Sequence, residues 1–377
     1  MIYLDNAATT KPYKEVVDTV VDVLSNHWGN ASSDNSLGYG AKEIIKSVTE
    51  QVADDINCNP SNIIWTSGAC EANSLAILGT LNANHHMHLW TTRMEHASIL
   101  EIIKNQLSIP MMFLNNTNYG FIDLHTLEKE LSNACQRNIK VLVSVHYANS
   151  EVGTIQDIYS IAELVHMYGG ILHVDATQMY PWGQIDVEEL GIDMMSVSGQ
   201  KLHGVKGIGF LYVKDGIKLS PRIYGSQQSG RRGGTYPTHL IAAFGKALEV
   251  TRKHDASKYV KTLRDALTKK LLEIPSTTLN GPSIDHSRLV NNISIIIDGV
   301  SAEEVVTLCD ARGIMIARGS ACQSYQVAPS NTLLAIGLNE HDALSTIRIT
   351  LDEFNTMEEV NQAAKEIKEV VEILRKY

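Results

Sequence analysis

Apolar residues follow two alternating patterns along the first two thirds of this chain. Short, nearly continuous apolar runs predict buried strands at 63–66, 89–91, 111–114, 141–145, 171–174, 194–197 and 210–213. Between them, apolar residues recur every three or four positions and predict helices at 14–27, 39–57, 97–106, 123–135 and 157–168. Buried strands that alternate with helices are typical of a parallel sheet covered on both faces. We therefore expect an α/β fold with a mainly parallel central sheet.

The pattern changes in the last third. One long helical region is expected from about 238 to 273. After Gly281-Pro282 come shorter elements, predicted as strands at 292–297, 314–317 and 345–351 and helices at 302–312 and 357–376. This order indicates a smaller α+β domain. We expect a large domain of residues 14–255 and a small domain formed by residues 1–13 together with 256–377.

Composition narrows the class of protein. The 377 residues are enough for about two domains. A formal charge of −10 argues against a basic surface that binds nucleic acid directly. The sequence has neither a membrane-length apolar run nor a signal peptide. Its five cysteines are spaced irregularly, unlike a disulfide framework or a zinc site. We expect a cytoplasmic protein with reduced thiols, no bound metal and no membrane segment.

The most informative stretch runs from Met194 to Val213 and contains Lys201. Two buried strands and a turn of small residues surround this lysine, which would leave its amine poorly hydrated and favour the neutral form. A neutral amine suits Schiff-base chemistry with an aldehyde cofactor. The alternative is a solvated lysine in a turn.

Other candidate groups lie just after predicted strands. His96, Asn149-Ser150, Asp175 and Lys201 all follow strand ends, where ligands bind in parallel sheets. The small residues after 63–66 lead into a helix whose first N–H groups could hold an anion, or form a tight turn without a ligand. Asp175 needs a cationic partner, either a protonated pyridine nitrogen or an arginine. His96 could stack on a ring or cap a helix. Together the groups describe a pyridoxal 5'-phosphate (PLP) site.

Specific motifs extend this reading over nearly the whole chain. They are YLDNAATT, TSGACEAN, MEHASI, NSEVGTIQDI, HVDATQ, SVSGQKLHGVKGIG, RRGGT, RLVNNISI, RGSACQS and IRITL. With these motifs the chain resembles cysteine desulfurases of the NifS/IscS group, which are class V aminotransferase-like PLP enzymes of fold type I.

The resemblance implies a role for each motif residue. Lys201 would bind the cofactor aldehyde, Asp175 the pyridine nitrogen and Gln178 the ring hydroxyl, while His96 stacks on the ring. The phosphate would be held by the backbone of Ala69 and Cys70, by Ser198 and Gln200, and by Thr235 of the partner subunit in a homodimer. Arg348 would clamp the substrate carboxylate, and Ser150 occupies a substrate-binding position.

Cys322 lies in a polar loop within ARGSACQSYQVAPS, which belongs to the expected small domain. A thiol on such a loop can reach the cleft, attack the substrate sulfur as a thiolate and carry it away as a persulfide. The alternative is an unreactive surface cysteine. With Lys201 and His96, Cys322 completes the predicted catalytic set. Cys58, Cys135 and Cys309 are expected to be packing residues.

The chain departs from the family pattern at several positions. Gln200 replaces a histidine, Cys70 a threonine and Ser150 an asparagine, and Tyr224-Gly225-Ser226-Gln227 replaces a glycine-rich run. These changes suggest a divergent member with weaker cofactor retention.

The expected reaction is desulfuration of L-cysteine to L-alanine with a persulfide on Cys322. The sulfur would pass to an acceptor protein, which could serve an iron–sulfur scaffold, tRNA thiolation or DNA phosphorothioation. Two alternatives stay open. One is a selenocysteine lyase or another class V lyase or transaminase, and the other is a low-activity sulfur-transfer scaffold.

Overall fold

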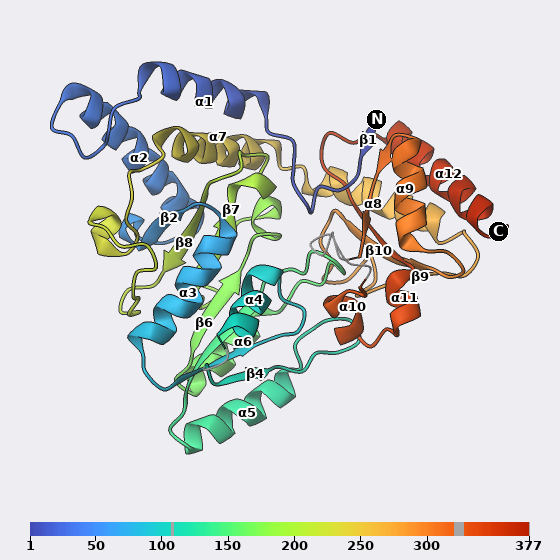
Figure 1. Cartoon of the computed structure of the whole chain (residues 1–377), viewed down its shortest axis with the longest axis horizontal. Coiled ribbons are helices and arrows are strands. Elements are labelled where there is room, and N and C mark those ends of the chain that lie inside the picture. The colour runs from blue at the N-terminus through green and yellow to red at the C-terminus, as the bar shows by residue number, and fades with distance from the viewer. Residues whose placement is uncertain (107–108, 320–327, 377) are drawn as a thin grey trace.

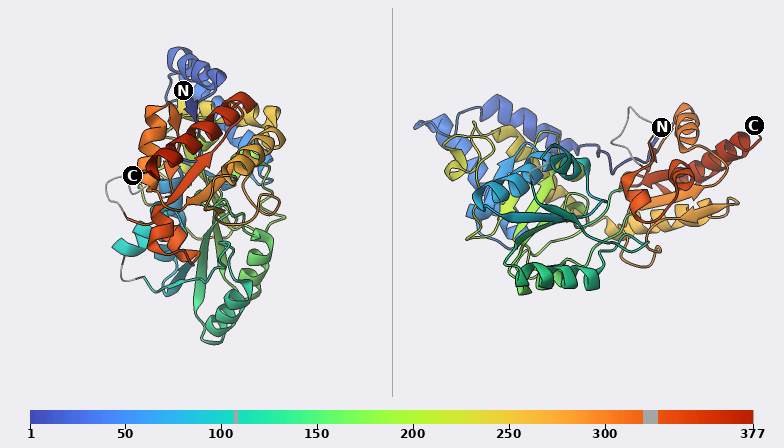
Figure 2. Two further views of the ribbon diagram at one scale, coloured as in Figure 1. Left: turned by 90° about the vertical axis from the view of Figure 1, so that its right-hand side faces the viewer. Right: turned by 60° about the horizontal axis from the view of Figure 1, so that its bottom comes forward.

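The computed structural model describes residues 1–106, 109–319 and 328–376. Figure 1 shows a larger body built around a sheet and a smaller body to its right, in which the N- and C-terminal segments lie together. Figure 2 shows the same two bodies from two further directions. The chain therefore begins and ends in the smaller body and builds the larger one in between.

A sheet of seven strands forms the centre of the larger body. Its order is β2 (Ile63–Thr66), β8 (Gly209–Val213), β7 (Met194–Ser198), β6 (Ile171–Asp175), β5 (Lys140–His146), β3 (Met87–Thr91) and β4 (Met111–Phe113). The strands from β7 to β4 are parallel, and β8 is antiparallel to both of its neighbours. The predicted α/β class with a mainly parallel sheet is confirmed.

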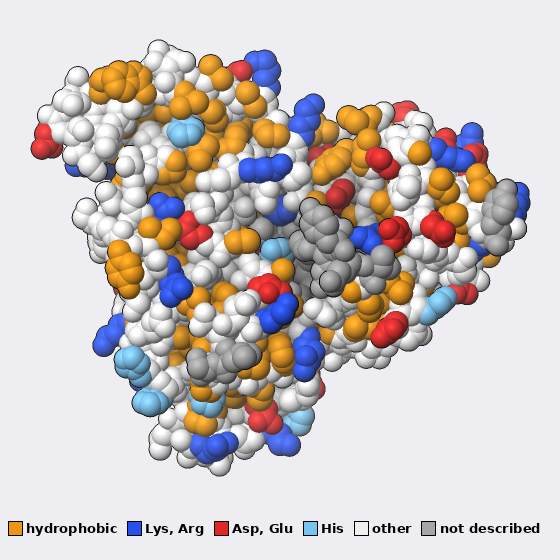
Figure 3. All heavy atoms as spheres, viewed as in Figure 1, with side chains coloured by type: hydrophobic (Ala, Val, Ile, Leu, Met, Phe, Trp, Pro, Cys, Tyr) orange, Lys and Arg blue, Asp and Glu red, His pale blue; other side chains and the backbone are white. Residues whose placement is uncertain are grey.

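Helices cover both faces of this sheet. They are α1 (Lys14–Asn26), α2 (Ser36–Asp55), α3 (Ala69–Ala83), α4 (Ala97–Asn105), α5 (Leu124–Gln136), α6 (Ile158–Met167) and α7 (Thr238–His254). The outer side of α1 is unusual because Val17, Val21 and Leu24 are exposed there. Figure 3 shows apolar side chains gathered over this helix and its neighbours.

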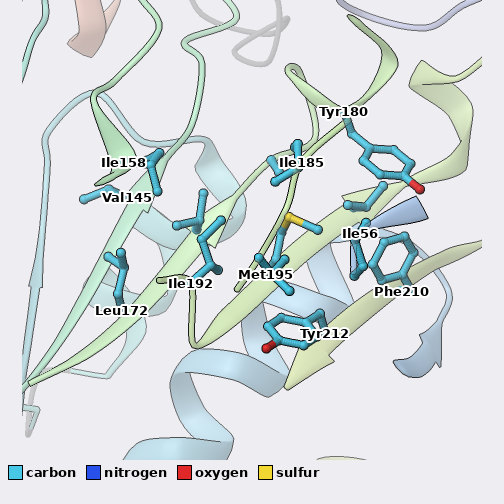
Figure 4. Close-up of a cluster of buried hydrophobic side chains, with 14 of the residues drawn as sticks. Ile56, Val145, Ile158, Leu172, Tyr180, Ile185, Ile192, Met195, Phe210 and Tyr212 are labelled. Carbon is cyan, nitrogen blue, oxygen red and sulfur yellow. The ribbon is translucent and has the colours of Figure 1, made fainter. Parts of the chain in front are cut away.

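Side-chain alternation along the strands produces separate cores on the two faces. Met194 packs with α3 residues such as Leu75, whereas the next residue, Met195, packs on the opposite face. Leu142 and Val143 of β5 divide in the same way, as the two-residue period of a strand requires. Figure 4 shows part of the larger core, including Met195, Phe210 and Tyr212. Burial on both faces explains why the strands read as continuous apolar runs.

The smaller body is built on an antiparallel sheet in the order β12 (Ala317–Arg318), β13 (Thr346–Thr350), β10 (Asn292–Ile297) and β9 (Thr277–Leu279). It also holds α8 (Ser257–Leu271), α9 (Ala302–Ala311), α10 (Asn331–Ala335), α11 (Glu340–Leu344) and α12 (Met357–Leu374). The first strand, β1 (Ile2–Tyr3), pairs in parallel with β11 (Ile314–Met315).

A separate apolar core fills the smaller body and includes Ile2 and Leu4 from the start of the chain. Because the two bodies have distinct cores and the N-terminal segment contributes to the second, we propose domains of residues 14–255 and of 1–13 together with 256–377.

Two predicted elements were wrong. The single helix expected at 238–273 is broken into α7 and α8, because Asp255 adopts a left-handed conformation with φ 42° and caps α7 by bonding Thr251. The strand expected at 314–317 is two strands, since the chain leaves β1 after Met315 and joins β13 at Ala317. The short strands β1 and β9 were not predicted.

Phe244→Ala should lower the free energy of unfolding by about 3 to 5 kcal/mol, because it leaves a cavity in the core. Phe244 is fully buried and meets Trp65 and Phe210 edge to face, with ring centroids 5.5 and 5.6 Å away. Denaturant unfolding of both proteins measures the change. In the control Met167→Ala, a side chain that is 67% exposed, we expect less than about 0.5 kcal/mol. Equal losses in the two variants would contradict this account of the core.

Candidate active site

A cavity of about 430 Å³ opens at the carboxyl ends of β5, β6 and β7. The N-terminal residues Ala7 and Ala8 form part of its wall. It is also lined by most of the residues predicted from sequence, namely Ala69, Cys70, His96, Ser150, Asp175, Gln178, Ser198, Gln200, Lys201 and Arg348. Thr235 is exposed and does not line this cavity, and Cys322 lies outside the described residues. The topology thus brings together residues from near the start of the sequence, such as Ala7, and from near its end, such as Arg348.

Lys201 ends the short 3₁₀ turn Gly199–Lys201 that follows β7. Its Nζ donates hydrogen bonds to the carbonyl oxygens of Ala7 at 2.6 Å and Ala8. The Ala7 N–H is in turn held by the Thr350 hydroxyl of β13 at 2.9 Å. The half-buried amine is therefore positioned between the sheet of the larger body and a strand of the smaller one.

Asp175 is the last residue of β6 and is 7% exposed. Its Oδ1 accepts the Thr177 N–H at 3.0 Å, and its Oδ2 accepts the Asn73 side-chain amide at 2.7 Å. Both donors are neutral, so a cationic group in the cavity would be the charged partner that a buried carboxylate requires. Asn73, a fully buried residue of α3, was not predicted, and its place inside TSGACEAN was the only available signal.

The turn between β2 and α3 forms a cup of backbone N–H groups of the kind that can hold an anion. Gly68 has φ 145°, and α3 then begins at Ala69 with its first N–H groups at the cavity. Ser198 and Gln200 line the same cavity from the other side. A Cβ on Gly209 would lie 2.8 Å from the Gly68 Cα. Glycine at 209 therefore allows the two chain segments to approach closely.

An ion pair between distant motifs braces this cup. Glu71 accepts the Ser67 N–H at 2.7 Å and pairs with Arg232 at 2.7 and 3.2 Å. Burial alone would raise the pKa of the Glu71 carboxyl, but the bonds from Arg232 and Ser67 outweigh it and lower that pKa. The pair was not predicted, although both residues lie in quoted motifs, because sequence gives no distance between TSGACEAN and RRGGT.

Two side-chain amides also attach the N-terminal segment to the cavity. Gln178 donates to the Ala7 carbonyl at 3.1 Å, and the Gln200 carbonyl accepts the Thr9 hydroxyl at 3.4 Å. Gln200, expected from the resemblance to stand in place of a histidine, is therefore a neutral residue with a contact of its own to this segment.

Arg348 supplies the strongest candidate for binding a carboxylate. It is 3% exposed, and its Nη2 donates to Asp5 at 2.7 Å. Its buried Nε has no hydrogen-bond partner among the described residues. A buried donor of this kind requires a partner, and a guanidinium offers its donors in a planar fork that matches a carboxylate.

His146 lines the cavity and was missed by sequence reasoning. It ends β5, directly beside Asp175 in the strand register, and its Nδ1 lies 2.8 Å from the Glu95 carboxylate. Burial alone would lower the pKa of His146, but the charges of Glu95 and Asp175 raise it above its ordinary value. The position at a strand end was the signal that could have found it.

The cysteines divide differently from the expectation. Cys309 is buried and Cys58 is half-buried, and burial raises the pKa of each thiol to about 12. Both fit packing roles. The same prediction for Cys135 was wrong, since that residue is exposed on α5. The helical period placed it near apolar positions, but not on the face that meets the sheet.

Comparison with known proteins identifies the family. A model of the aminotransferase class-V family matches residues 2–363. The chain belongs to the class-V aminotransferase family. Cysteine desulfurase IscS 1 of Archaeoglobus fulgidus is 35% identical to it over 382 residues, which span 100% of this chain and 98% of that protein. The family resemblance seen in the motifs is therefore confirmed.

Solved structures give the same result for the fold. A NifS-like protein from Rickettsia africae matches with a TM-score of 0.88 and 28% identity, covering 99% of both chains. A structure of SspA in complex with cysteine matches with a TM-score of 0.81 and 32% identity, covering 94% of this chain and 100% of that chain.

The described residues contain neither a membrane-spanning helix nor a metal-binding cluster. Within them, no helix is long and apolar enough to cross a bilayer. The same residues contain no group of His, Cys, Asp and Glu side chains arranged to hold a metal ion.

Glu71→Gln should lower the free energy of unfolding by about 1 to 3 kcal/mol at neutral pH, because it removes the charge that Arg232 faces. The folded-state pKa of Glu71 lies below its ordinary value. The ion pair therefore stabilises the protein at pH values above the ordinary pKa of a glutamate. This stabilisation is lost as the pH falls through the folded-state pKa. The gap between variant and wild type should shrink below about pH 4.

Denaturant unfolding at a series of pH values measures this gap. Glu128→Gln is a matched control, because Glu128 is exposed on α5. A gap between Glu71→Gln and wild type that stays constant into the acid range would contradict the role given to the ion pair.

Proposed function

We propose that this protein is a PLP-dependent cysteine desulfurase that converts L-cysteine into L-alanine and a persulfide on Cys322. The observation that carries the proposal is the convergence of Lys201, Asp175, the cup at α3 and Arg348 on one cavity. Its volume is in the range of small-molecule sites. The full-length relative named as a cysteine desulfurase and the SspA structure that contains cysteine support the same substrate.

The residues of the cavity fit PLP as a cofactor. The carboxylate of Asp175, bonded only by neutral donors among those described above, suits a protonated pyridine nitrogen. The phosphate would sit at the N-terminus of α3 against Ala69 and Cys70, with Ser198 and Gln200 opposite. Gln178 would contact the ring hydroxyl and His96 the ring face. When bound, PLP supplies an electron sink for charge that develops on the substrate α-carbon.

The remaining residues bind the substrate and move its protons. Arg348, which lines the cavity beside Ser150, binds the substrate carboxylate through its planar guanidinium. Lys201 binds the cofactor aldehyde, and either Lys201 or His96 removes the α-proton. Asp5 orients Arg348 by accepting from its Nη2.

Sulfur transfer completes the reaction. The Cys322 thiolate attacks the substrate Sγ, an S–S bond forms and the C–S bond breaks. The electron pair of the broken bond stays with the substrate. Its β-carbon takes up a proton, its α-carbon regains the proton that was removed, and the product leaves as L-alanine. The persulfide then passes to an acceptor protein that belongs to an iron–sulfur, tRNA-thiolation or DNA-phosphorothioation system. Cys322 enters on sequence grounds, as it lies outside the described residues.

The proposed active form is a homodimer. Thr235 is exposed and outside its own cavity, which fits a residue that completes the phosphate site of a second copy. Nearby in sequence, Ile223 and Tyr224 are 42% and 84% exposed. Such large exposed apolar side chains, together with the outer face of α1 (Figure 3), are suited to burial against another copy of the chain.

Cys322→Ser should reduce alanine release from L-cysteine at least a hundredfold, because a hydroxyl does not accept sulfur as a thiolate does. Alanine production by the PLP-loaded enzyme measures the effect, and Cys135→Ser, at an exposed thiol on α5, is the matched control. Wild-type rates in Cys322→Ser would rule out the proposed nucleophile. Comparison of L-cysteine with selenocysteine would separate a desulfurase from a selenocysteine lyase.

Cys70→Thr should bind PLP roughly two- to tenfold more tightly, because the hydroxyl adds one hydrogen bond at the cup. Cys70 is the second residue of α3 and lines the cavity. Titration of the cofactor-free protein with PLP, followed by absorbance, gives the two dissociation constants. Cys135→Thr serves as the control, and an unchanged affinity in Cys70→Thr would refute the idea that this departure weakens cofactor retention.

A further inference from the structure

A continuous chain of hydrogen bonds joins Asp175 to His96 inside the cavity wall. It runs from the Asp175 carboxylate to the Asn73 amide, from that amide to the Ser98 hydroxyl at 2.9 Å, and from the hydroxyl to the His96 Nδ1 at 2.8 Å. This hydrogen-bond chain crosses from α3 to α4, and the two helices pack against each other (Figure 1). No role in the proposed reaction has so far used Asn73 or Ser98.

The direction of each bond follows from chemistry. An aspartate carboxylate only accepts, so the Asn73 amide must turn its Nδ2 toward Asp175. The same nitrogen donates its second N–H to the Ser98 oxygen. The Ser98 hydroxyl keeps both its proton and a second lone pair, so it donates to the His96 Nδ1 when that nitrogen presents its own lone pair. The Asn73 orientation is not set by its other end, since its Oδ1 has no partner among the described residues.

A second donor reaches the same atom of His96. The backbone N–H of Ser98 lies 3.1 Å from Nδ1, where the histidine side chain caps the N-terminus of α4. A backbone N–H can only donate, so Nδ1 must present its lone pair. The ring proton then resides on Nε2, and a doubly protonated ring would direct an N–H against two donors.

We propose that Asn73 and Ser98 are positioning residues that hold His96 as the neutral tautomer with its proton on Nε2. This inference rests on the proposed function, in which His96 faces the cofactor ring. A neutral imidazole could lie against a ring whose protonated nitrogen donates to the Asp175 carboxylate, whereas an imidazolium would bring two like charges together. Asp175, at one end of the hydrogen-bond chain, thus favours a neutral His96 at the other end, through Asn73 and Ser98.

The tautomer also separates two roles that the proposed mechanism left open. The basic nitrogen of His96 is Nδ1, which is occupied by the two donors from Ser98. From Nε2 the ring offers a hydrogen-bond donor and no lone pair. Removal of the substrate α-proton therefore falls to Lys201, and His96 acts as a donor and as a surface for the ring.

Charged groups surround His96 on several elements. Those that line the same cavity are Glu71, His146, Asp175, Lys201, Lys206 and Arg348, and the Glu151 carboxylate is also near enough to interact with His96 electrostatically. Because charges of both signs are present, they act on the ring in opposite directions. Among the contacts of His96 described above, the two donors on Nδ1 are the ones that favour one neutral tautomer over the other.

The tautomer can be measured directly on the PLP-loaded enzyme. NMR of protein labelled with ring-¹³C histidine distinguishes the two neutral tautomers and the imidazolium by the Cδ2 shift, and loss of one signal in His96→Gln assigns it. We expect the Nε2–H form for wild type at neutral pH. A wild-type signal of the Nδ1–H tautomer or of the imidazolium would overturn the proposal.

A matched pair of variants tests the roles of the side chains. Ser98→Ala removes the hydroxyl and keeps the backbone N–H of residue 98 as a donor to the His96 Nδ1. Because one donor from this residue holds the tautomer less firmly than two, we expect a His96 signal with mixed protonation and a kcat reduced about tenfold, with KM changed less than about twofold. Ser98→Thr keeps the hydroxyl and should restore both the signal and kcat. If Ser98→Ala retains the wild-type His96 signal and kcat, or if Ser98→Thr fails to restore them, Ser98 is not a positioning residue.

This experiment is independent of the substrate assignment. The NMR measurement needs no substrate, so an enzyme that releases no alanine from L-cysteine would refute the proposed function and leave the tautomer to be decided by its own signal. Conversely, an active desulfurase whose His96 carries its proton on Nδ1 would refute the proposal about Asn73 and Ser98 alone.

Discussion

The buried carboxylate of Asp175 is the constraint on which the rest of the cavity depends. A charge at the end of a central strand is costly unless other groups stabilise it. The backbone of Thr177 and the amide of Asn73 provide neutral donors, and the cavity leaves space for a cation. Its neighbours in the sheet fix its position, since Asp175 pairs with His146 on one side and Ser196 on the other. Moving any of these strands would move the charge.

The N-terminal segment is the second constraint because it joins the two bodies at the reacting groups. Its first strand packs in the smaller body, while the carbonyl groups of Ala7 and Ala8 accept from Lys201 in the larger one. Asp5, from the same segment, holds Arg348. The Lys201 amine and the Arg348 guanidinium are therefore positioned relative to each other by the N-terminal segment, which contacts both. The smaller body and the N-terminal segment supply Arg348, Ala7 and Ala8 to the cavity wall, and the larger body supplies the rest.

The cup shows how a divergent sequence keeps a similar shape. By the family resemblance, Gln200 and Cys70 stand in place of a histidine and a threonine, but the features that shape the turn are backbone features: the φ of Gly68, the close approach of Gly209 and the start of α3. The Glu71–Arg232 pair braces that turn from outside. Substitutions in the cup therefore affect affinity for the anion more than the architecture that presents the N–H groups.

The sequence by itself determined the alternation of strands and helices, the mainly parallel sheet and the residues at the strand ends, because burial on both faces leaves a local signal in each segment. Only the tertiary structure decided which of these residues share contacts. The Asp175–Asn73–Ser98–His96 chain, the Glu71–Arg232 pair and His146 beside Asp175 all join segments far apart in sequence. The break at Asp255 and the exposed face of Cys135 were likewise missed, since backbone turns and helix orientation depend on packing against distant elements. The periodicity of apolar residues reflects which side of a helix or strand is buried, which is a local property. Hydrogen bonds across the cavity join distant segments and produce no pattern in the sequence.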